Sequence, residues 1–143
     1  MARIKIEIPD IVLFTTEIRV RITDINYGNH VGNDAIVQII HEARAQFLAS
    51  HGFTELNAGG TALIMSNLII DFKKESFFGD LLTVKLYAGN ITNVSFDLFY
   101  SISTERDSQE ILIVKAQTGM VCYDYVARKV SAITPAILKI IQP

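Results

Sequence analysis

The first part of the chain alternates apolar and polar positions. Isoleucines alternate with charged residues over residues 4–8, and a similar alternation returns over residues 17–22. A period of two residues is typical of a strand with one buried face, so both segments are predicted to be strands. Residues 24–34 then hold two glycines, three asparagines and two aspartates, which indicates a loop.

A single long helix is predicted after this loop. Its apolar positions recur at three- and four-residue spacings: Ile36, Ile39, Ile40, Ala43 and Phe47. Asn33 is the expected N-cap, Asp34 adds a negative charge where the helix dipole favours one, and Gly52 is the expected stop. These signals place the helix at about residues 34–50.

After Gly59-Gly60 the pattern predicts strands. The segments are rich in Val, Ile, Thr, Phe and Tyr and cover residues 61–73, 81–92, 94–104 and 111–125. The breaks between them are short, which favours antiparallel hairpins. Thr134-Pro135 is the expected start of a short tail helix. Because no further helices separate the strands, a doubly wound parallel sheet is excluded. The predicted class is α+β, with an antiparallel sheet curved around one long central helix.

Composition narrows the functional class. The chain has 143 residues, which fits one domain spanning residues 1–143. With 13 basic and 15 acidic residues the net charge is −2, so a general nucleic-acid-binding protein is not expected. Cys122 is the only cysteine and cannot form an intrachain disulfide. We find no signal-peptide pattern and no long apolar run, so we expect a soluble cytoplasmic protein without a membrane segment.

Several short motifs occur in order along the chain. The stretch VRITDINYGNHVGNDAIVQIIHEARAQFL, residues 20–48, contains Asp24-Ile25-Asn26, His30-Val31-Gly32-Asn33 and Glu42-Ala43-Arg44. Two later stretches are SFFGDLLTV at residues 76–84 and VKAQTGMVCYD at residues 114–124. In order and spacing, the chain from about residue 14 to residue 138 resembles the hot-dog acyl-CoA thioesterases of the 4-hydroxybenzoyl-CoA thioesterase type.

The resemblance implies a hot-dog fold, no cofactor, and a thioester of CoA or acyl-carrier protein as the substrate. It also implies a homodimer, or a tetramer of two dimers, with the acyl group in an apolar groove beside the helix at the dimer interface. One departure bears on the mechanism, because the usual catalytic aspartate of the family falls on Asn26. An amide can orient water or a carbonyl through hydrogen bonds, but it cannot take a proton from water at neutral pH.

Thioester hydrolysis requires a polarised carbonyl, an activated water or nucleophile, and departure of the thiolate. Backbone amides at the helix N-terminus, from about Gly32, Asn33 and Asp34, would polarise the carbonyl. His30 is the one side chain of the loop suited to act as a base near neutral pH, and Asn26 would orient the reactants. Each of these residues also has a purely structural alternative. The amides would belong to an ordinary helix start, His30 would hydrogen-bond the loop backbone, and Asn26 would form a turn.

Four other residues are candidates for the site. Glu42 lies at the edge of the apolar stripe, where partial burial would favour the neutral carboxyl and suit it to base chemistry. An exposed glutamate or an ion pair is the alternative. Asp34 is a further catalytic candidate, although an aspartate in a first helical turn commonly complements the dipole. Lys73 and Lys74 would meet the phosphates of CoA, or would simply be solvated.

The remaining polar residues have structural explanations. Arg44 falls inside the apolar arc of the helix and needs a carboxylate partner, so a structural ion pair is expected. Asp24 is a candidate brace for the loop, and Cys122 is expected to fill the core. His41 and His51 lack the spacing of metal ligands, so no metal site is assigned.

We therefore expect an acyl-CoA thioesterase that releases free acid and CoA from a small or medium acyl thioester. A non-catalytic acyl-thioester-binding protein is the first alternative, because Asn26 replaces a carboxylate. A dehydratase acting on 3-hydroxyacyl thioesters is the second, with His30 and Glu42 as its acid–base pair. Release of free CoA separates the thioesterase from both alternatives.

Overall fold

The computed structural model describes residues 4–143, and one antiparallel sheet dominates it. The strands are β1 (Phe14–Arg19), β2 (Ala62–Phe72), β3 (Leu81–Gly89), β4 (Ser95–Arg106), β5 (Gln109–Asp124) and β6 (Lys129–Val130). They follow the spatial order β1-β3-β4-β5-β2, and β6 pairs with β5. Strands β1 and β2 therefore lie at the two ends of the main sheet.

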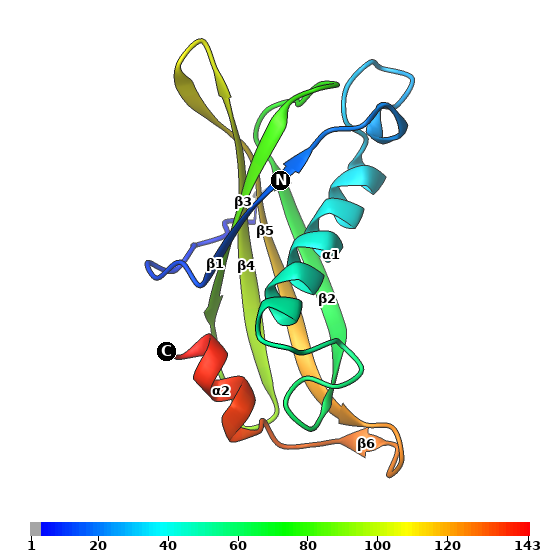
Figure 1. Cartoon of the computed structure of the whole chain (residues 1–143), viewed down its shortest axis with the longest axis vertical. Coiled ribbons are helices and arrows are strands. Elements are labelled where there is room, and N and C mark those ends of the chain that lie inside the picture. Colours follow the sequence, from blue (N-terminus) through cyan, green and yellow to red (C-terminus); the bar gives the residue numbers. More distant parts are fainter. Residues whose placement is uncertain (1–3) are drawn as a thin grey trace.

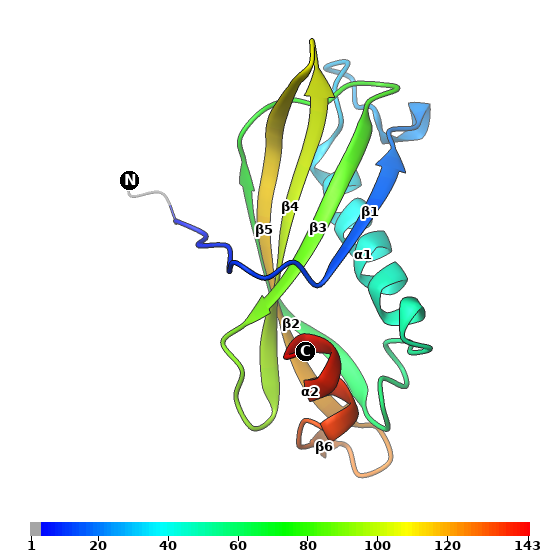
Figure 2. The same cartoon turned by 60° about the vertical axis from the view of Figure 1, so that its left-hand side comes forward.

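Two α-helices accompany the sheet. The long helix α1 (Asn33–Ser50) lies across the inner face of the curved sheet, and the short helix α2 (Pro135–Ile141) packs near β3 (Figures 1 and 2). A 3-10 turn, η1 (Ile22–Asp24), precedes the loop that leads into α1. The order of one strand, the long helix and then strands β2 to β6 confirms the predicted α+β class.

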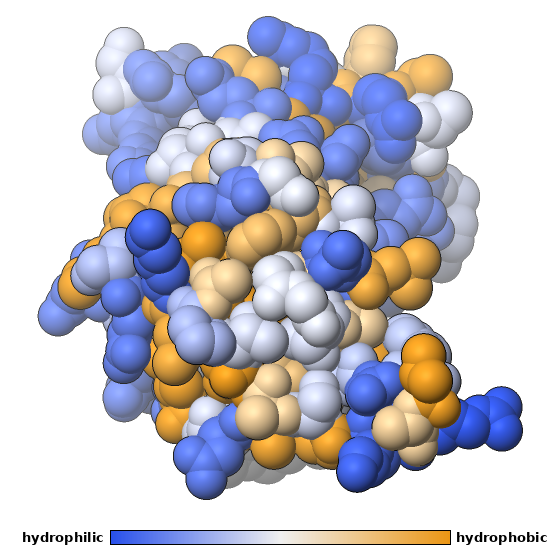
Figure 3. All heavy atoms as spheres, turned by 60° about the horizontal axis from the view of Figure 1, so that its bottom comes forward, coloured by the Kyte–Doolittle hydropathy of each residue, from blue (hydrophilic) through white to orange (hydrophobic). Residues whose placement is uncertain are grey.

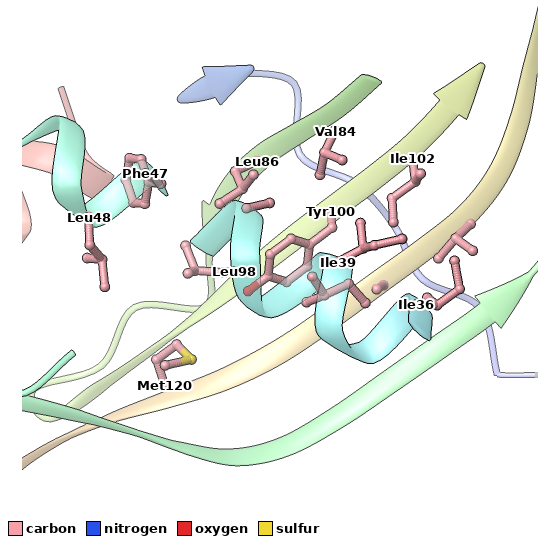
Figure 4. Packing of buried hydrophobic residues seen from close by; sticks show 14 of the residues in the cluster. Ile36, Ile39, Phe47, Leu48, Val84, Leu86, Leu98, Tyr100, Ile102 and Met120 are labelled. Carbon is pink, nitrogen blue, oxygen red and sulfur yellow. The ribbon is translucent and has the colours of Figure 1, made fainter. Parts of the chain in front are cut away.

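The core lies between α1 and the inner face of the sheet (Figure 4). Alternate residues of each strand face inward, so Leu82, Val84 and Leu86 of β3 are fully buried. Inward residues of β4, among them Leu98 and Tyr100, pack against α1. Eight residues of α1 are buried, and they occupy the wide arc that the sequence pattern indicated.

Two predictions about local structure are wrong. Residues 4–8 belong to no strand: this segment crosses the outer face of the sheet, and Ile6 packs there on Tyr87 and Phe99 (Figure 2). The alternation arose because one side of the segment is buried by side-chain contacts rather than by strand pairing. Asn33 is not the N-cap, because it is already helical, and the capping position belongs to Gly32.

The end of the molecule that carries α2 and the turn between β5 and β6 has a mixed surface. Figure 3 shows apolar and hydrophilic residues intermingled there. Single exposed apolar residues such as Leu56 and Val126 are normal on folded proteins and need no functional explanation.

A buried polar network joins α1 to the sheet. Arg44 is 5% exposed, and its Nε donates to Glu55 Oε1 at 2.8 Å. Its Nη1 donates to the Tyr100 hydroxyl at 3.4 Å, and Tyr100 bonds Thr118 Oγ1 at 2.8 Å. Burial raises the pKa of Tyr100, so the phenol stays protonated. The predicted structural ion pair of Arg44 is confirmed.

Replacing Glu55 alone should destabilise the fold, because it leaves the Arg44 guanidinium buried without a carboxylate. We expect Glu55→Leu to lower the free energy of unfolding by about 3 kcal/mol in urea titrations. The double variant Arg44→Met with Glu55→Leu removes both charges and should recover most of that loss. A double variant as unstable as the single one would contradict this account of the network.

Candidate active site

A cleft of about 790 Å³ opens at the N-terminal end of α1. The loop before α1 forms one wall, and the segment that follows β2 forms the other. The cleft is lined by Asn26, Tyr27, His30, Val31, Asn33, Asp34, Ile36, Phe72, Lys73, Lys74, Glu75, Ser76, Ile113 and Val114. Most of the sequence-predicted site residues are therefore brought together here.

Backbone hydrogen bonds fix the loop in place. Asp24 is buried, and its carboxylate accepts the Arg21 amide at 2.8 Å while its carbonyl accepts the Gly32 amide at 3.1 Å. The Val31 amide donates to the Ser76 carbonyl at 2.9 Å, which ties the two walls of the cleft together. Asp24 is thus the loop brace that the sequence predicted.

Asn26 makes a turn and also faces the helix start. Its Oδ1 accepts the Gly28 amide at 2.8 Å, as in an Asx turn. A Cβ added at Gly28 would lie 3.2 Å from both Asn26 Oδ1 and His30 Nε2, so these polar atoms converge on one small space. The Asn26 Cβ and Nδ2 atoms lie 3.5 and 3.7 Å from the point where a Cβ on Gly32 would stand. The Asn26 side chain therefore lies beside the N-terminus of α1.

The ring of His30 contacts both its own loop and the second wall of the cleft. In the neutral tautomer protonated at Nδ1, this nitrogen donates to the Val31 carbonyl, 3.2 Å away. The lone pair then belongs to Nε2, which lies 3.9 Å from Glu75 Oε1. This arrangement leaves Nε2 as the basic atom on the cleft side of the ring.

The amides of the helix start are not equally available. The Gly32 amide bonds the Asp24 carbonyl and the Asp34 amide bonds Asn33 Oδ1 at 2.9 Å, so neither is free to polarise a carbonyl. Among residues 4–143, the Asn33 amide donates to no acceptor. Of the three expected donors, Asn33 is the one that remains. The Asp34 side chain is exposed at the same rim.

Glu42 lies apart from this cleft. It is exposed and lines a groove between β1 and α1 together with Gln38, Ile39 and Gln46. The expected partial burial is wrong, because the buried arc of α1 ends before it reaches Glu42 on this side of the helix. Within one chain Glu42 therefore does not pair with His30, as a dehydratase site of the expected kind would require.

The second wall carries basic residues and one carboxylate that sequence reasoning missed. The amides of Lys73 and Lys74 both donate to the Ile113 carbonyl, and Lys73 Nζ pairs with Asp71 at 2.8 Å. Glu75 follows them, and its backbone carbonyl accepts Arg106 Nη2 at 2.8 Å. Nothing in the sequence pattern indicated that Glu75 and His30 would meet, because 45 positions separate them and each lies outside the regular elements.

Three other features bear on the kind of site: metal-binding clusters, the cysteine and membrane-spanning helices. No group of three or more His, Cys, Asp or Glu side chains gathers in metal-binding geometry within residues 4–143. Cys122 is fully buried, and desolvation raises the pKa of its thiol, which suits core packing rather than nucleophilic attack. Over the same residues no helix combines the length and hydropathy needed to cross a membrane.

The fold and the cleft at the start of the buried helix define a hot-dog protein of the thioesterase class. The sequence model of the thioesterase-like superfamily matches residues 20–141, and the chain belongs to this superfamily. It is 32% identical to the 1,4-dihydroxy-2-naphthoyl-CoA hydrolase of Acaryochloris marina over 113 residues, 77% of this chain and 82% of that one. It is 27% identical to the long-chain acyl-CoA thioesterase FadM of Escherichia coli over 119 residues, 82% and 89% of the two chains.

Solved structures agree on the fold. The 1,4-dihydroxy-2-naphthoyl-CoA thioesterase Slr0204 from Synechocystis superposes with a TM-score of 0.79 at 29% identity, covering 90% of this chain and 94% of that one. A 4-hydroxybenzoyl-CoA thioesterase complexed with 4-hydroxybenzoyl-CoA gives a TM-score of 0.78 at 15% identity, with 90% and 98% covered. The expected resemblance to hot-dog acyl-CoA thioesterases is confirmed.

Proposed function

We propose that this protein is an acyl-CoA thioesterase that uses His30 to activate water in the cleft at the N-terminus of α1. The single observation that carries the proposal is the convergence of Asn26, His30 and Glu75 on that cleft in a member of the thioesterase-like superfamily. The relatives described above are named as acyl-CoA hydrolases or thioesterases, and this supports the same reaction class here.

In the proposed reaction a water molecule attacks the thioester carbonyl. Its oxygen bonds to the carbonyl carbon, and its proton passes to His30 Nε2. The Asn33 amide and Asn26 Nδ2 donate to the oxygen that becomes negative in the tetrahedral intermediate. The carbon–sulfur bond then breaks, and the imidazolium returns the proton to the departing thiolate. Free acid and CoA leave the site.

Glu75 supplies the negative charge that Asn26 cannot provide. A carboxylate 3.9 Å from Nε2 stabilises the imidazolium as it forms. Because the Glu75 side chain is 64% exposed, solvent screens this interaction in the open cleft, and a bound substrate that excludes water would strengthen it. The hydrogen bond from Arg106 to the Glu75 carbonyl fixes the position of the Glu75 backbone, from which the carboxylate side chain extends.

The substrate is proposed to be a small or medium acyl thioester of CoA or of acyl-carrier protein. Lys73 and Lys74 at the rim would contact its phosphates, which both carriers possess. Asp34 lies at the same rim, where its charge favours the helix start. We also propose a cytoplasmic location, which fits this substrate class and stays a prediction.

The proposed assembly is a homodimer, or a tetramer of two dimers, formed through β2. This strand ends the sheet, and its exposed side chains include Met65 at 41% and Phe72 at 47%. The neighbouring α1 adds Val37, which is 38% exposed. A strand that ends its sheet and lies beside exposed apolar side chains favours pairing with the same strand of a second copy.

A non-catalytic acyl-thioester-binding protein is the second candidate. It is motivated by the resemblance noted in the sequence, which implies that Asn26 stands where the family usually has a carboxylate. Such a protein would bind acyl-CoA in the same cleft without releasing CoA.

Site variants should separate these functions when free thiol is measured with a panel of acyl-CoAs. We expect His30→Ala to lower kcat about 100-fold with little change in KM, since it removes the base. Glu75→Gln should lower kcat about tenfold, and Glu75→Asp should recover part of that loss. Glu110→Gln, an exposed carboxylate on β5, is the matched control and should stay at the wild-type rate.

The same assay contains the result that overturns the proposal. If the wild type releases no thiol while Asn26→Asp does, the natural protein is a binder. Wild-type turnover that survives in His30→Ala would reject His30 as the base while leaving the thioesterase function standing.

Light scattering should test the assembly. We expect a mass at least about twice the 15.9 kDa of one chain, and a shift to monomer in Met65→Asp on the β2 edge. Thr15→Asp on the opposite edge, β1, is the control and should not change the mass. A monomeric wild type would contradict the proposed interface.

A further inference from the structure

The second wall of the cleft belongs to the connection between β2 and β3, residues 73–80, which contains no helix or strand. Its first two amides donate to one carbonyl of β5, and the carbonyl of its last residue accepts the amide that follows β1. Between these ends lies Glu75, whose Oε1 is 3.9 Å from His30 Nε2. The position of that carboxylate therefore depends on the contacts made by the middle of the connection.

The last four residues of the connection form a tight turn. The Asp80 amide donates to the Phe77 carbonyl at 3.0 Å, and Gly79 at the third position has a φ of 88°. A positive φ at this position favours glycine, because an L side chain would be strained there. Asp80 Oδ2 also accepts the Phe77 amide at 2.9 Å. The Gly-Asp pair noted in the sequence therefore closes this turn and places a carboxylate against it.

Arg106 joins this turn to Glu75. It ends β4, and the turn between β4 and β5 lies at the same end of the molecule as the connection (Figures 1 and 2). Its Nη2 donates to the Glu75 carbonyl at 2.8 Å and to Asp80 Oδ2 at 2.7 Å. Its guanidinium lies over the Phe77 ring, 4.9 Å from the ring centre. We call Arg106, Asp80 and Phe77 the clamp.

The contacts of the clamp hold the guanidinium in one place. The side chains of Arg106 and Asp80 are 30% and 18% exposed, so their ion pair is partly shielded from water. A charge-assisted hydrogen bond is stronger than a neutral one, and an aromatic face adds attraction for the cation. Because the planar group meets three partners at once, the Glu75 carbonyl is held with it. None of the three clamp residues lines the cleft.

We propose that Arg106 is a positioning residue that keeps Glu75 beside His30. The inference rests on the proposed thioesterase function and adds a residue that acts on the reaction from outside the cleft. The Glu75 side chain is 64% exposed, so few neighbours restrain it directly. Its fixed backbone therefore does most to keep the carboxylate within reach of His30 Nε2. Without the clamp the carboxylate is still present, but it stabilises the imidazolium less of the time.

The test measures kcat for thiol release in single and double variants. We expect Arg106→Leu to lower kcat about tenfold with little change in KM, the same loss as in Glu75→Gln. The double variant should lose no more than either single variant, because both changes remove one interaction. A loss of about a hundredfold in the double variant would contradict the proposal, since Arg106 would then act independently of Glu75.

Two further variants test whether the guanidinium itself is required. Arg106→Lys keeps a positive charge for Asp80 without the planar fork, and it should recover part of the lost kcat. Asp80→Asn can still accept the Phe77 amide but removes the charge that holds Arg106, and it should lower kcat in the same direction as Arg106→Leu. Both variants keep the proposal testable if Arg106→Leu does not fold. Full wild-type kcat in both would contradict it.

Arg19→Leu is the matched control. Arg19 Nη1 donates to the Gly79 carbonyl at 2.9 Å, so the change removes an arginine–backbone hydrogen bond from the same connection without touching Glu75. We expect this variant to keep the wild-type kcat. An equal loss of kcat in Arg19→Leu and Arg106→Leu would reject the proposal, because any loosening of the connection would then have the same effect.

The ¹⁵N signals of the His30 ring separate this inference from the proposed function. Glu75→Gln should shift the Nε2 signal because it removes a nearby charge, Arg106→Leu should reproduce that shift, and Arg19→Leu should not. If the wild type releases no thiol but Arg106→Leu still reproduces the shift, the thioesterase proposal fails and the positioning role stands. If Arg106→Leu leaves the signal unmoved, Arg106 is rejected as a positioning residue whether or not thiol is released.

Discussion

The burial of one helix against the inner face of a curved sheet sets the position of every functional feature. The inward residues of β3 and β4 hold α1 along one arc, and its N-terminus therefore points at the segment that follows β2. The same placement leaves one side of α1 facing β2 and the other facing β1. The cleft, the groove beside β1 and the separation of Glu42 from His30 all follow from this single packing arrangement.

Local patterns predicted the fold well because each major element has a strong periodicity of its own. The helix was expected at about residues 34–50 and occupies Asn33–Ser50, and the four strands after it were expected near their observed positions. The pattern failed where burial comes from something other than strand pairing or helix packing. Ile6 alternates with polar neighbours because it covers Tyr87 and Phe99 on the outer face, which no local pattern could distinguish from a strand.

The site was only partly predictable for a similar reason. Asn26 and His30 lie within one short loop and Asn33 begins the helix that follows it, so their proximity was visible in the sequence. Glu75 reaches His30 only because the Val31 amide bonds the Ser76 carbonyl and Arg106 holds the Glu75 carbonyl. These long-range backbone contacts have no counterpart in a single sequence. A carboxylate partner for Arg44 could be expected from the sequence, but the sequence did not indicate that this partner is Glu55.

In the proposed mechanism, His30 activates a water molecule in a site where Asn26 takes the place of the aspartate that the family resemblance implies. Single-turnover hydrolysis in ¹⁸O-labelled water tests this most directly, with mass analysis of the acid and of the protein. Direct attack by water predicts one labelled oxygen in the acid from the first turnover and no label in the protein. An unlabelled acid with label retained in Glu75 would contradict the account, because it would mean that a carboxylate attacked the thioester.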